Sequence, residues 1–217
     1  MNKSMYSLIL SDEVVAAIDM MALRKGMSRS AMINSILAEY ASLMTPEKRI
    51  NNVLQCIEKL IGADESLVAF TEPNKTFMSV KSSLEYRYRP TIKYVLELYR
   101  KPDGAIGELT VTFRTQSDTL IAALTDFFRL FKKLEDTYTA RYYKHGALRY
   151  ELYENRFVRT IAIPEGKDYT PEQLGGAISE YVRMLDTLMK GYITGRLNVS
   201  ALEKSYVAFL ERGSGLI

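Results

Sequence analysis

The sequence of 217 residues predicts an α+β protein in two parts. We expect a small strand–helix–helix (βαα) unit in residues 1–44, followed by a larger α+β domain in residues 45–217. Three observations lead to this prediction. A short extended segment precedes two amphipathic helical patterns, several later segments alternate apolar and polar residues with a period of two, and the order strand, turn, strand, helix occurs twice.

The N-terminal unit is predicted from helix start and stop signals. Residues 5–10 form an apolar extended run that leads into Ser11, whose hydroxyl can cap the following helix. Gly26 is placed to end that helix, and Ser28 can cap a second one. The first helix has its apolar stripe at Val14, Ile18 and Met21. The second has its stripe at Ile33, Ile36, Leu37 and Tyr40.

A unit of some forty residues has too little volume to bury its own apolar faces. It must pack on the rest of the chain or pair with a second copy. Three segments agree in order and spacing with a known pattern, namely Leu8–Val14, Gly26–Ile33 and Ala38–Tyr40. They resemble the ribbon-helix-helix family, the CopG/Arc-type repressors. The resemblance covers residues 3–44 only, and the C-terminal domain resembles no family that we recognise.

The resemblance implies a homodimer, or a higher oligomer, on double-stranded DNA. Two strands, one from each subunit, would pair antiparallel and lie in the major groove, with the four helices beneath them. The implied register places Tyr6, Leu8 and Leu10 in the core. The DNA-facing positions would be Lys3, Met5, Ser7 and Ile9 on the strand and Ser28, Arg29 and Ser30 at the phosphate-binding start of the second helix.

This outer strand face departs from the family, which favours polar and basic side chains there. Ser7 can exchange hydrogen bonds with a base edge, whereas Met5 and Ile9 can contact only thymine methyl groups or other apolar surface. Arg29 and Ser28 also have a purely structural interpretation, as a solvated side chain and a helix cap. An amphipathic helical hairpin packed on its own domain is the alternative for the whole segment.

The larger domain is predicted to begin at Thr45–Pro46, a helix-start signal. A helix with an apolar stripe over residues 50–61 follows. Alternation then predicts a strand from Phe77 to about residue 88, and a hairpin over residues 92–113 that turns at Lys101–Gly104. Ser117 opens a long apolar helix.

The same order follows once more. We predict strands at residues 148–152 and 157–163 and a helix opened by a capping box at Thr170–Gln173. A second capping box, Ser200–Glu203, predicts a final helix. The expected architecture is a duplicated ββα module, which forms one antiparallel sheet with its long helices on one face.

Composition excludes several classes. The net charge is +3, and residues 3–44 carry four basic and four acidic residues, so charge alone does not indicate nucleic acid. The only histidine, His145, and the only cysteine, Cys56, are too few for a metal centre of the nickel-sensor type, so we expect no metal and no cofactor. No catalytic motif can be assembled, and an enzyme is the least favoured class. Without a membrane span or signal peptide, we expect a cytoplasmic protein.

The larger domain is rich in tyrosine interleaved with basic residues, as in Tyr86–Arg89 and Arg141–Lys144. Such groups could stack on and pair with a nucleotide or nucleic acid. Alternatively, alternating tyrosines line a core while the arginines face water, and this interpretation explains most positions without a ligand.

We therefore expect a dimeric, sequence-specific transcription regulator, with a C-terminal domain that oligomerises, binds a small-molecule or protein effector, or both. Two alternatives remain. The chain could be an antitoxin whose C-terminal domain binds a partner protein, or a plasmid or chromosome segregation factor that binds repeated sites.

Overall fold

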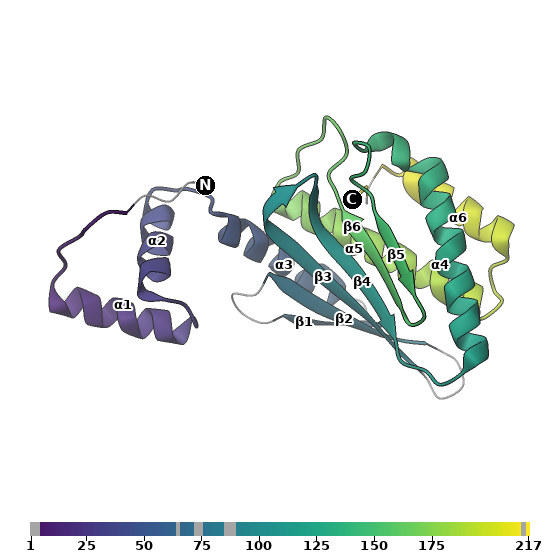
Figure 1. Cartoon of the computed structure of the whole chain (residues 1–217), viewed down its shortest axis with the longest axis horizontal. Coiled ribbons are helices and arrows are strands. Elements are labelled where there is room, and N and C mark those ends of the chain that lie inside the picture. The colour runs from purple at the N-terminus through teal and green to yellow at the C-terminus, as the bar shows by residue number, and fades with distance from the viewer. Residues whose placement is uncertain (1–4, 64–65, 72–75, 85–89, 214–215) are drawn as a thin grey trace. The chain divides into compact units, whose positions relative to one another are not determined.

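The computed structural model describes residues 5–63, 66–71, 76–84, 90–213 and 216–217. The chain forms two compact units, Met1–Lys48 and Arg49–Ile217, which are described separately (Figure 1). The described residues contain six α-helices, one short 3-10 helix and six strands. No helix among them combines the length and the apolar character needed to cross a bilayer.

The N-terminal unit consists of helices α1 (Asp12–Arg24) and α2 (Arg29–Tyr40). The strand predicted for residues 5–10 is absent: these residues are extended but pair with no other strand. The physical reason is that a β-strand needs backbone hydrogen bonds to a neighbouring strand, and within the described residues this segment has none. Ser11 precedes α1, as predicted, but its side chain makes no capping hydrogen bond.

The larger unit is an α+β structure that contains most of helix α3 (Pro46–Ile61). At the start of this helix, the Thr45 hydroxyl accepts a hydrogen bond from the Lys48 N–H at 3.1 Å. The remaining elements are β1 (Leu67–Thr71), β2 (Phe77–Ser83), β3 (Thr91–Asp103), β4 (Ala105–Phe113), α4 (Asp118–Tyr138), η1 (Ala140–Tyr142), β5 (Tyr150–Tyr153), β6 (Arg156–Ile161), α5 (Pro171–Ile193) and α6 (Val199–Glu211). Strand, strand and helix thus follow one another twice, as β3-β4-α4 and as β5-β6-α5. The part of the predicted strand after Leu84 falls on residues 85–89, outside the described ranges.

All six strands form one antiparallel sheet in the order β1-β2-β3-β4-β6-β5. The turn between β3 and β4 is made by Gly104, whose φ of +74° is a conformation that other residues rarely adopt. Along each central strand, burial alternates residue by residue, so that one face of the sheet is covered and the other is accessible. The predicted antiparallel sheet with its helices on one face is therefore confirmed.

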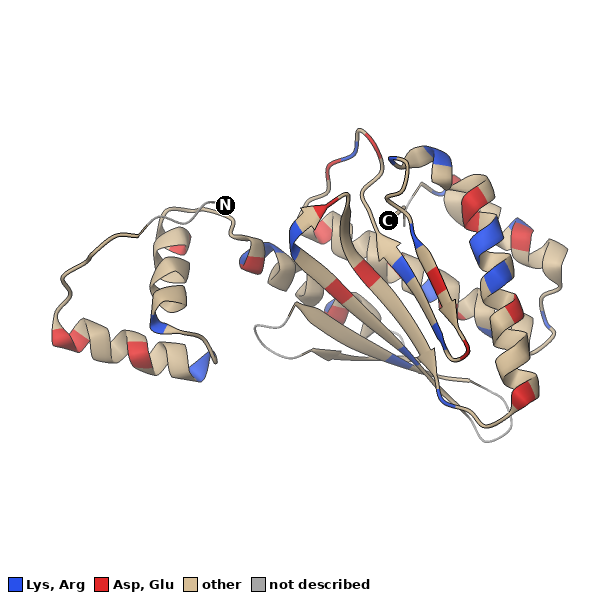
Figure 2. Ribbon diagram, viewed as in Figure 1, with Lys and Arg blue, Asp and Glu red and all other residues tan. Residues whose placement is uncertain are grey.

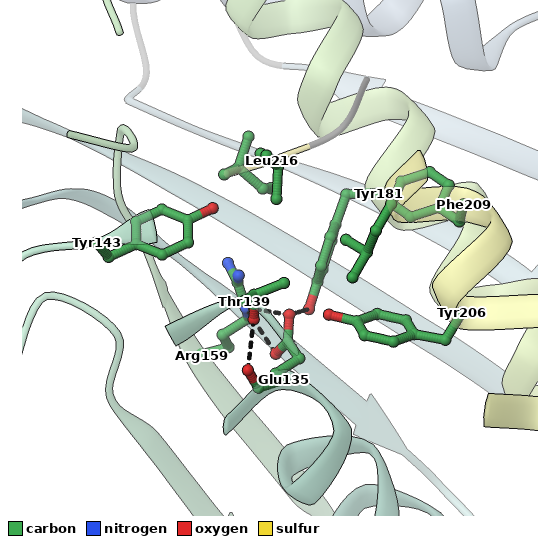
Figure 3. Close-up of a pocket in the computed structure, with 10 residues that line it drawn as sticks. Glu135, Thr139, Tyr143, Arg159, Tyr181, Tyr206, Phe209 and Leu216 are labelled. Atoms are coloured by element: carbon green, nitrogen blue, oxygen red, sulfur yellow. Dashed lines mark hydrogen bonds and ion pairs between the residues drawn. The ribbon is translucent and has the colours of Figure 1, made fainter. Parts of the chain in front are cut away.

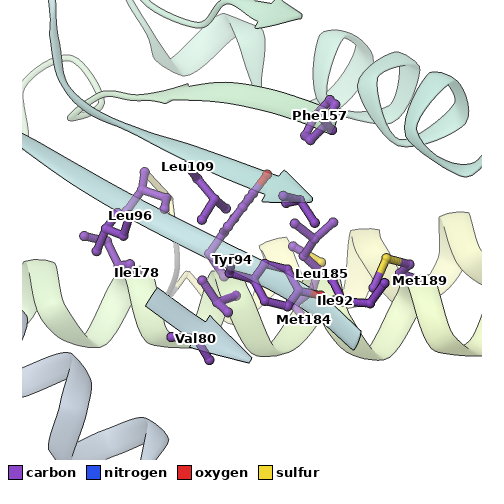
Figure 4. Close-up of a cluster of buried hydrophobic side chains, with 14 of the residues drawn as sticks. Val80, Ile92, Tyr94, Leu96, Leu109, Phe157, Ile178, Met184, Leu185 and Met189 are labelled. Atoms are coloured by element: carbon purple, nitrogen blue, oxygen red, sulfur yellow. The ribbon is translucent and has the colours of Figure 1, made fainter. Parts of the chain in front are cut away.

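Helices α3, α4 and α5 supply the apolar layer against the covered face of the sheet. Figure 4 shows Ile178, Leu185 and Met189 of α5 beside Tyr94 and Leu96 of β3. Tyr94 is fully buried, and its hydroxyl donates to Asp186 Oδ1 at 2.8 Å. A stack of phenylalanines from α4 and β6 extends the layer: Phe127, Phe128, Phe131 and Phe157.

Local sequence signals account for most helix starts. Ser117 accepts from the Leu120 N–H at the start of α4. At α5, the predicted capping box between Thr170 and Gln173 is present in both directions. The prediction for the last helix is wrong by two residues: Asn198, not Ser200, is the cap, because its side-chain oxygen accepts from the Ala201 N–H at 2.9 Å. Asparagine competes well with serine at this position.

Candidate nucleic-acid interface

The turn between α1 and α2 is built around Gly26. Its N–H donates to the Leu23 carbonyl, and the Met27 N–H donates to the Ala22 carbonyl at 3.0 Å. These two bonds define a Schellman motif, which requires a residue in the left-handed region, and Gly26 has a φ of +61°. The turn predicted from the sequence is thus present, and it fixes where α2 begins.

The start of α2 carries three residues that the sequence predicts as DNA contacts. Ser28 is the N-cap, and its hydroxyl accepts from the Ala31 N–H at 3.3 Å. The N–H groups of Arg29 and Ser30 lie in the first turn, where an α-helix provides no acceptor of its own. They are available to a phosphate oxygen, and the positive end of the helix dipole favours that ligand.

The Arg29 side chain, however, does not point to solvent alone. Its Nε and Nη2 donate to the two carboxylate oxygens of Asp19 on α1, at 2.6 and 2.5 Å. This hydrogen-bonded pair holds the pKa of Asp19 below its ordinary value and raises the pKa of Arg29. A phosphate contact by Arg29 would use the N–H donors that Asp19 leaves free or would compete with that carboxylate. The sequence pattern did not reveal this pair because the two residues are ten positions apart.

The predicted strand residues are all exposed in the single chain, but not equally. Leu8 and Leu10 are 61% and 37% exposed, whereas Met5 and Ile9, at alternate positions, are fully exposed. Of the three side chains predicted to face a dimer core, Leu8 and Leu10 are thus the better covered, whereas Tyr6 is 83% exposed. Ser7 is exposed, like the rest of this segment. Lys3 lies outside the described residues.

The N-terminal unit leaves much of its apolar surface open. Among its described residues, the core cluster consists of Ile18, Ala22 and Met32, with Met27, Ile33 and Ile36 packed beside them, and Ala38 is buried separately. The predicted stripe residues Val14, Met21, Leu37 and Tyr40 are exposed, as are Tyr6, Met20, Leu23, Leu43 and Met44. Exposed apolar surface on this scale marks an interaction surface. Figure 2 shows that charge does not dominate this unit, since acidic and basic positions occur together on it.

The larger unit contains a second group of functional-type residues, a buried ion pair within a ring of tyrosines (Figure 3). Arg159 of β6 points into the covered face and donates from Nε to Glu135 Oε2 of α4 at 2.9 Å, with both side chains fully buried. The Tyr181 hydroxyl donates to Glu135 Oε1 at 3.0 Å, and the Arg159 guanidinium lies 4.5 Å from the centre of the Tyr181 ring. Burial raises the pKa of Tyr181 well above its ordinary value.

Around this pair, the hydroxyls of Tyr143, Tyr150 and Tyr206 are buried. They approach Arg159, Glu135 and Thr139 respectively, but no well-formed hydrogen bond is made to them in the described part of the chain. The space between these side chains is too narrow, as they lie, for a water molecule to enter. The C-terminal Ile217 is buried and contributes to its wall. The arrangement is therefore a closed polar core that orders β6, α4 and α5, and not an open ligand pocket.

Sequence reasoning missed Arg159 and Glu135 although a signal was present. The alternation of β6 places Arg159 between the inward residues Phe157 and Ile161, and Glu135 lies on the apolar face of α4. A basic and an acidic residue at two core positions predict a buried pair, because neither can be desolvated alone. Several of the predicted core tyrosines are also buried, namely Tyr94, Tyr143, Tyr181 and Tyr206. Tyr86 and Tyr88 lie outside the described residues.

The remaining candidate groups are isolated. Cys56 is partly buried, and its thiol donates to the Glu172 carbonyl at 3.5 Å. Burial, followed by the charge of Glu172, raises the pKa of this thiol. Within the described ranges, no three His, Cys, Asp or Glu side chains are grouped so that they could hold a metal ion. Comparisons of the chain with protein-family models, with curated proteins and with solved structures find no match.

Proposed function

We propose that the chain is a dimeric DNA-binding regulator of transcription, whose N-terminal unit pairs with a second copy and contacts the major groove. The observation that carries this proposal is the open apolar surface of the unit, combined with an extended, unpaired segment directly before α1. A chain that left this surface in water would lose roughly 25 cal/mol for each Å² of apolar area that pairing could cover.

In the proposed dimer, residues 5–10 of two copies pair antiparallel into a ribbon. The better-covered side chains, Leu8 and Leu10, then complete the core with the stripes of α1 and α2. Met5, Ser7 and Ile9 face the DNA, where Ser7 can bond to a base edge and the other two can contact thymine methyl groups. The first N–H groups of α2 bind a backbone phosphate on each side of the ribbon.

The register can be tested with one substitution at two neighbouring positions. Leu8→Asn puts a polar amide into the proposed core and should prevent dimerisation, whereas Ile9→Asn should leave the dimer intact and alter only the DNA affinity. Sedimentation equilibrium of the full chain measures the first effect, and selection from a random DNA library followed by fluorescence anisotropy measures the second. Dimers lost equally in both variants, or a chain that enriches no DNA sequence, would contradict the proposal.

The role of Arg29 can be tested against its partner Asp19. If Arg29 turns from the carboxylate to a phosphate on binding, Asp19→Asn should strengthen binding to all sequences, because the intrachain competitor is removed. Arg29→Ala should weaken binding uniformly and lower the salt dependence by about one unit or less. Equal affinity for all three proteins would show that Arg29 stays on Asp19 and that backbone N–H groups alone make the contact.

The larger unit is proposed to serve in assembly. The space beside Glu135 is too narrow, as the side chains lie, for a small-molecule effector, and most of one face of its sheet is accessible, although Thr160 of β6 is buried there. A regulator with such a unit could join several DNA-bound dimers or strengthen a single one.

A further inference from the structure

The accessible face of the sheet carries its charges in separate rows. Side chains of adjacent strands that are directly paired on this face form a row across the sheet. The first row runs through Val68, Lys81, Lys93, Thr112, Arg156 and Tyr153. It contains three cations and no carboxylate.

The second and third rows differ from the first. The next row along the strands contains Phe70, Ser79, Val95, Thr110, Val158 and Glu151, and is neutral except at its last position. In the row after that, Glu97 of β3 is paired directly with Glu108 of β4. The Tyr99 hydroxyl donates to Glu108 at 3.1 Å, but no cation pairs with Glu97 in the described part of the chain. Figure 2 shows acidic and basic positions at different levels along the central strands.

Two of these pairings are unfavourable within one chain. Lys81 lies directly opposite Lys93, and Glu97 lies directly opposite Glu108. Like charges at directly paired positions destabilise a sheet. Among the described residues, no carboxylate relieves the lysines, although Lys81 lies over the Phe70 ring at 4.7 Å. Opposite charge supplied from outside the chain would relieve Lys93 and Glu97, one member of each pair, together.

We propose that the accessible face binds the same face of a second copy, related by a two-fold axis that lies across the strands along the Val95 row. This axis places the first row of each copy over the third row of the other, so that Lys93 meets Glu97 of the second copy and Glu97 meets its Lys93. The other positions of the two rows meet uncharged side chains, with Lys81 over Phe77, Arg156 over Thr160 and Glu108 over Thr112. The neutral row then lies against itself, with Val95 and Val158 in its centre. An axis along the strands would instead place lysine on lysine.

Nucleic acid fits this face less well. The basic row would attract a phosphate backbone, but the Glu97–Glu108 row lies only about 13 Å away along the strands and would repel it. A second copy brings Lys93 and Glu97 against opposite charge, whereas a polyanion meets the basic row alone.

The area of the face indicates that the proposed contact is weak when it forms alone. Six strands about 4.8 Å apart and three rows of side chains give roughly 500 Å² per copy, against about 800 Å² per partner in a standard stable interface. Such a contact is weak alone and gains from a second link between the same chains, which raises the effective concentration. The inference thus rests on the proposed N-terminal dimer.

Cross-linking of the full chain in a Cys56→Ser background tests the axis. Val95→Cys lies on it, next to the same residue of the second copy, whereas the control Thr91→Cys is on the same face and strand but about 27 Å from its counterpart. With a short bismaleimide, we expect about tenfold more cross-linked dimer for Val95→Cys.

Charge exchange in the Val95→Cys protein tests the rows. Lys93→Glu or Glu97→Lys alone relieves repulsion within a chain but creates it between copies, and each contact occurs twice, so cross-linking should fall about tenfold. The double exchange should restore it. Because each single exchange improves pairing within its own chain, a loss of cross-linking would not come from unfolding.

The outcomes separate the two proposals. A sedimenting dimer that cross-links equally at residues 91 and 95, or that ignores the charge exchanges, overturns the sheet contact and leaves the N-terminal dimer standing. A monomeric chain without cross-links overturns both. Protection of Val95→Cys from the reagent by an added oligonucleotide would show that nucleic acid occupies the face instead, and would overturn the proposed contact.

Discussion

Replacement of Glu135 by leucine should be the most damaging single change in the larger unit. The substitution leaves the Arg159 guanidinium buried without its counter-charge, and it removes the acceptor of the Tyr181 hydroxyl. Removal of one partner from a buried ion pair costs about 3–5 kcal/mol. Arg159→Met should cost a similar amount, because it leaves the Glu135 carboxylate buried with only the tyrosine to stabilise it.

The double variant Glu135→Leu/Arg159→Met should be more stable than either single variant. It leaves no buried charge, and the largest remaining loss is the unpaired Tyr181 hydroxyl, at about 1–3 kcal/mol. Urea unfolding of the full chain, followed by far-UV circular dichroism and tyrosine fluorescence, measures the three free energies of unfolding. The coupling between the two sites should be several kcal/mol. Additive effects in the double variant would show that the pair makes no joint contribution, and would refute the reasoning.

Two further predictions concern the same unit. Gly175→Ala should destabilise the unit, because a Cβ at this position would lie 2.7 Å from the Cys56 Cβ. Gly176→Ala is the control: its Cβ meets open space and should stabilise α5 by about 0.5–1 kcal/mol. Thermal unfolding temperatures that shift in the same direction for both variants would contradict this prediction. Burial, and for Tyr94 also Asp186, raises the pKa of Tyr94 and Tyr181 well above 10.0. The stability they provide is therefore complete below a pH of about 10, where the unfolded chain keeps its phenol protons, and should fall as the pH rises further. Unfolding midpoints that do not change up to the point of phenolate absorbance would contradict the second prediction.

The sheet and most helix boundaries follow from local patterns in the sequence. Alternation with a period of two predicts the β3–β4 hairpin because one face of that sheet is covered and the other is not. The starts at Ser117 and Thr170 are predicted because a cap depends on residues only three positions apart. Asn198 was missed because Ser200 offered an equally good local signal, and only tertiary packing selects between them.

The candidate sites depend on contacts that local patterns do not contain. The Arg29–Asp19 pair is made between two helices, so that no periodicity indicates it. The rows of like charge on the open face become visible only when the strand registers are known, since Lys81 and Lys93 are separated by twelve positions in the chain. The strand predicted for residues 5–10 is absent because an apolar extended pattern is not sufficient: a strand also needs a hydrogen-bonding neighbour, which no local pattern supplies.

The contact between Gly175 and Cys56 has a consequence for the history of the protein. The two positions share one small volume, where the second turn of α5 packs against α3. A larger side chain can be accepted at either position only if the other becomes smaller or the helices move apart. In descendants of this sequence, substitutions at residues 56 and 175 should therefore occur together, and a substitution by a larger residue at only one of the two positions should be rare.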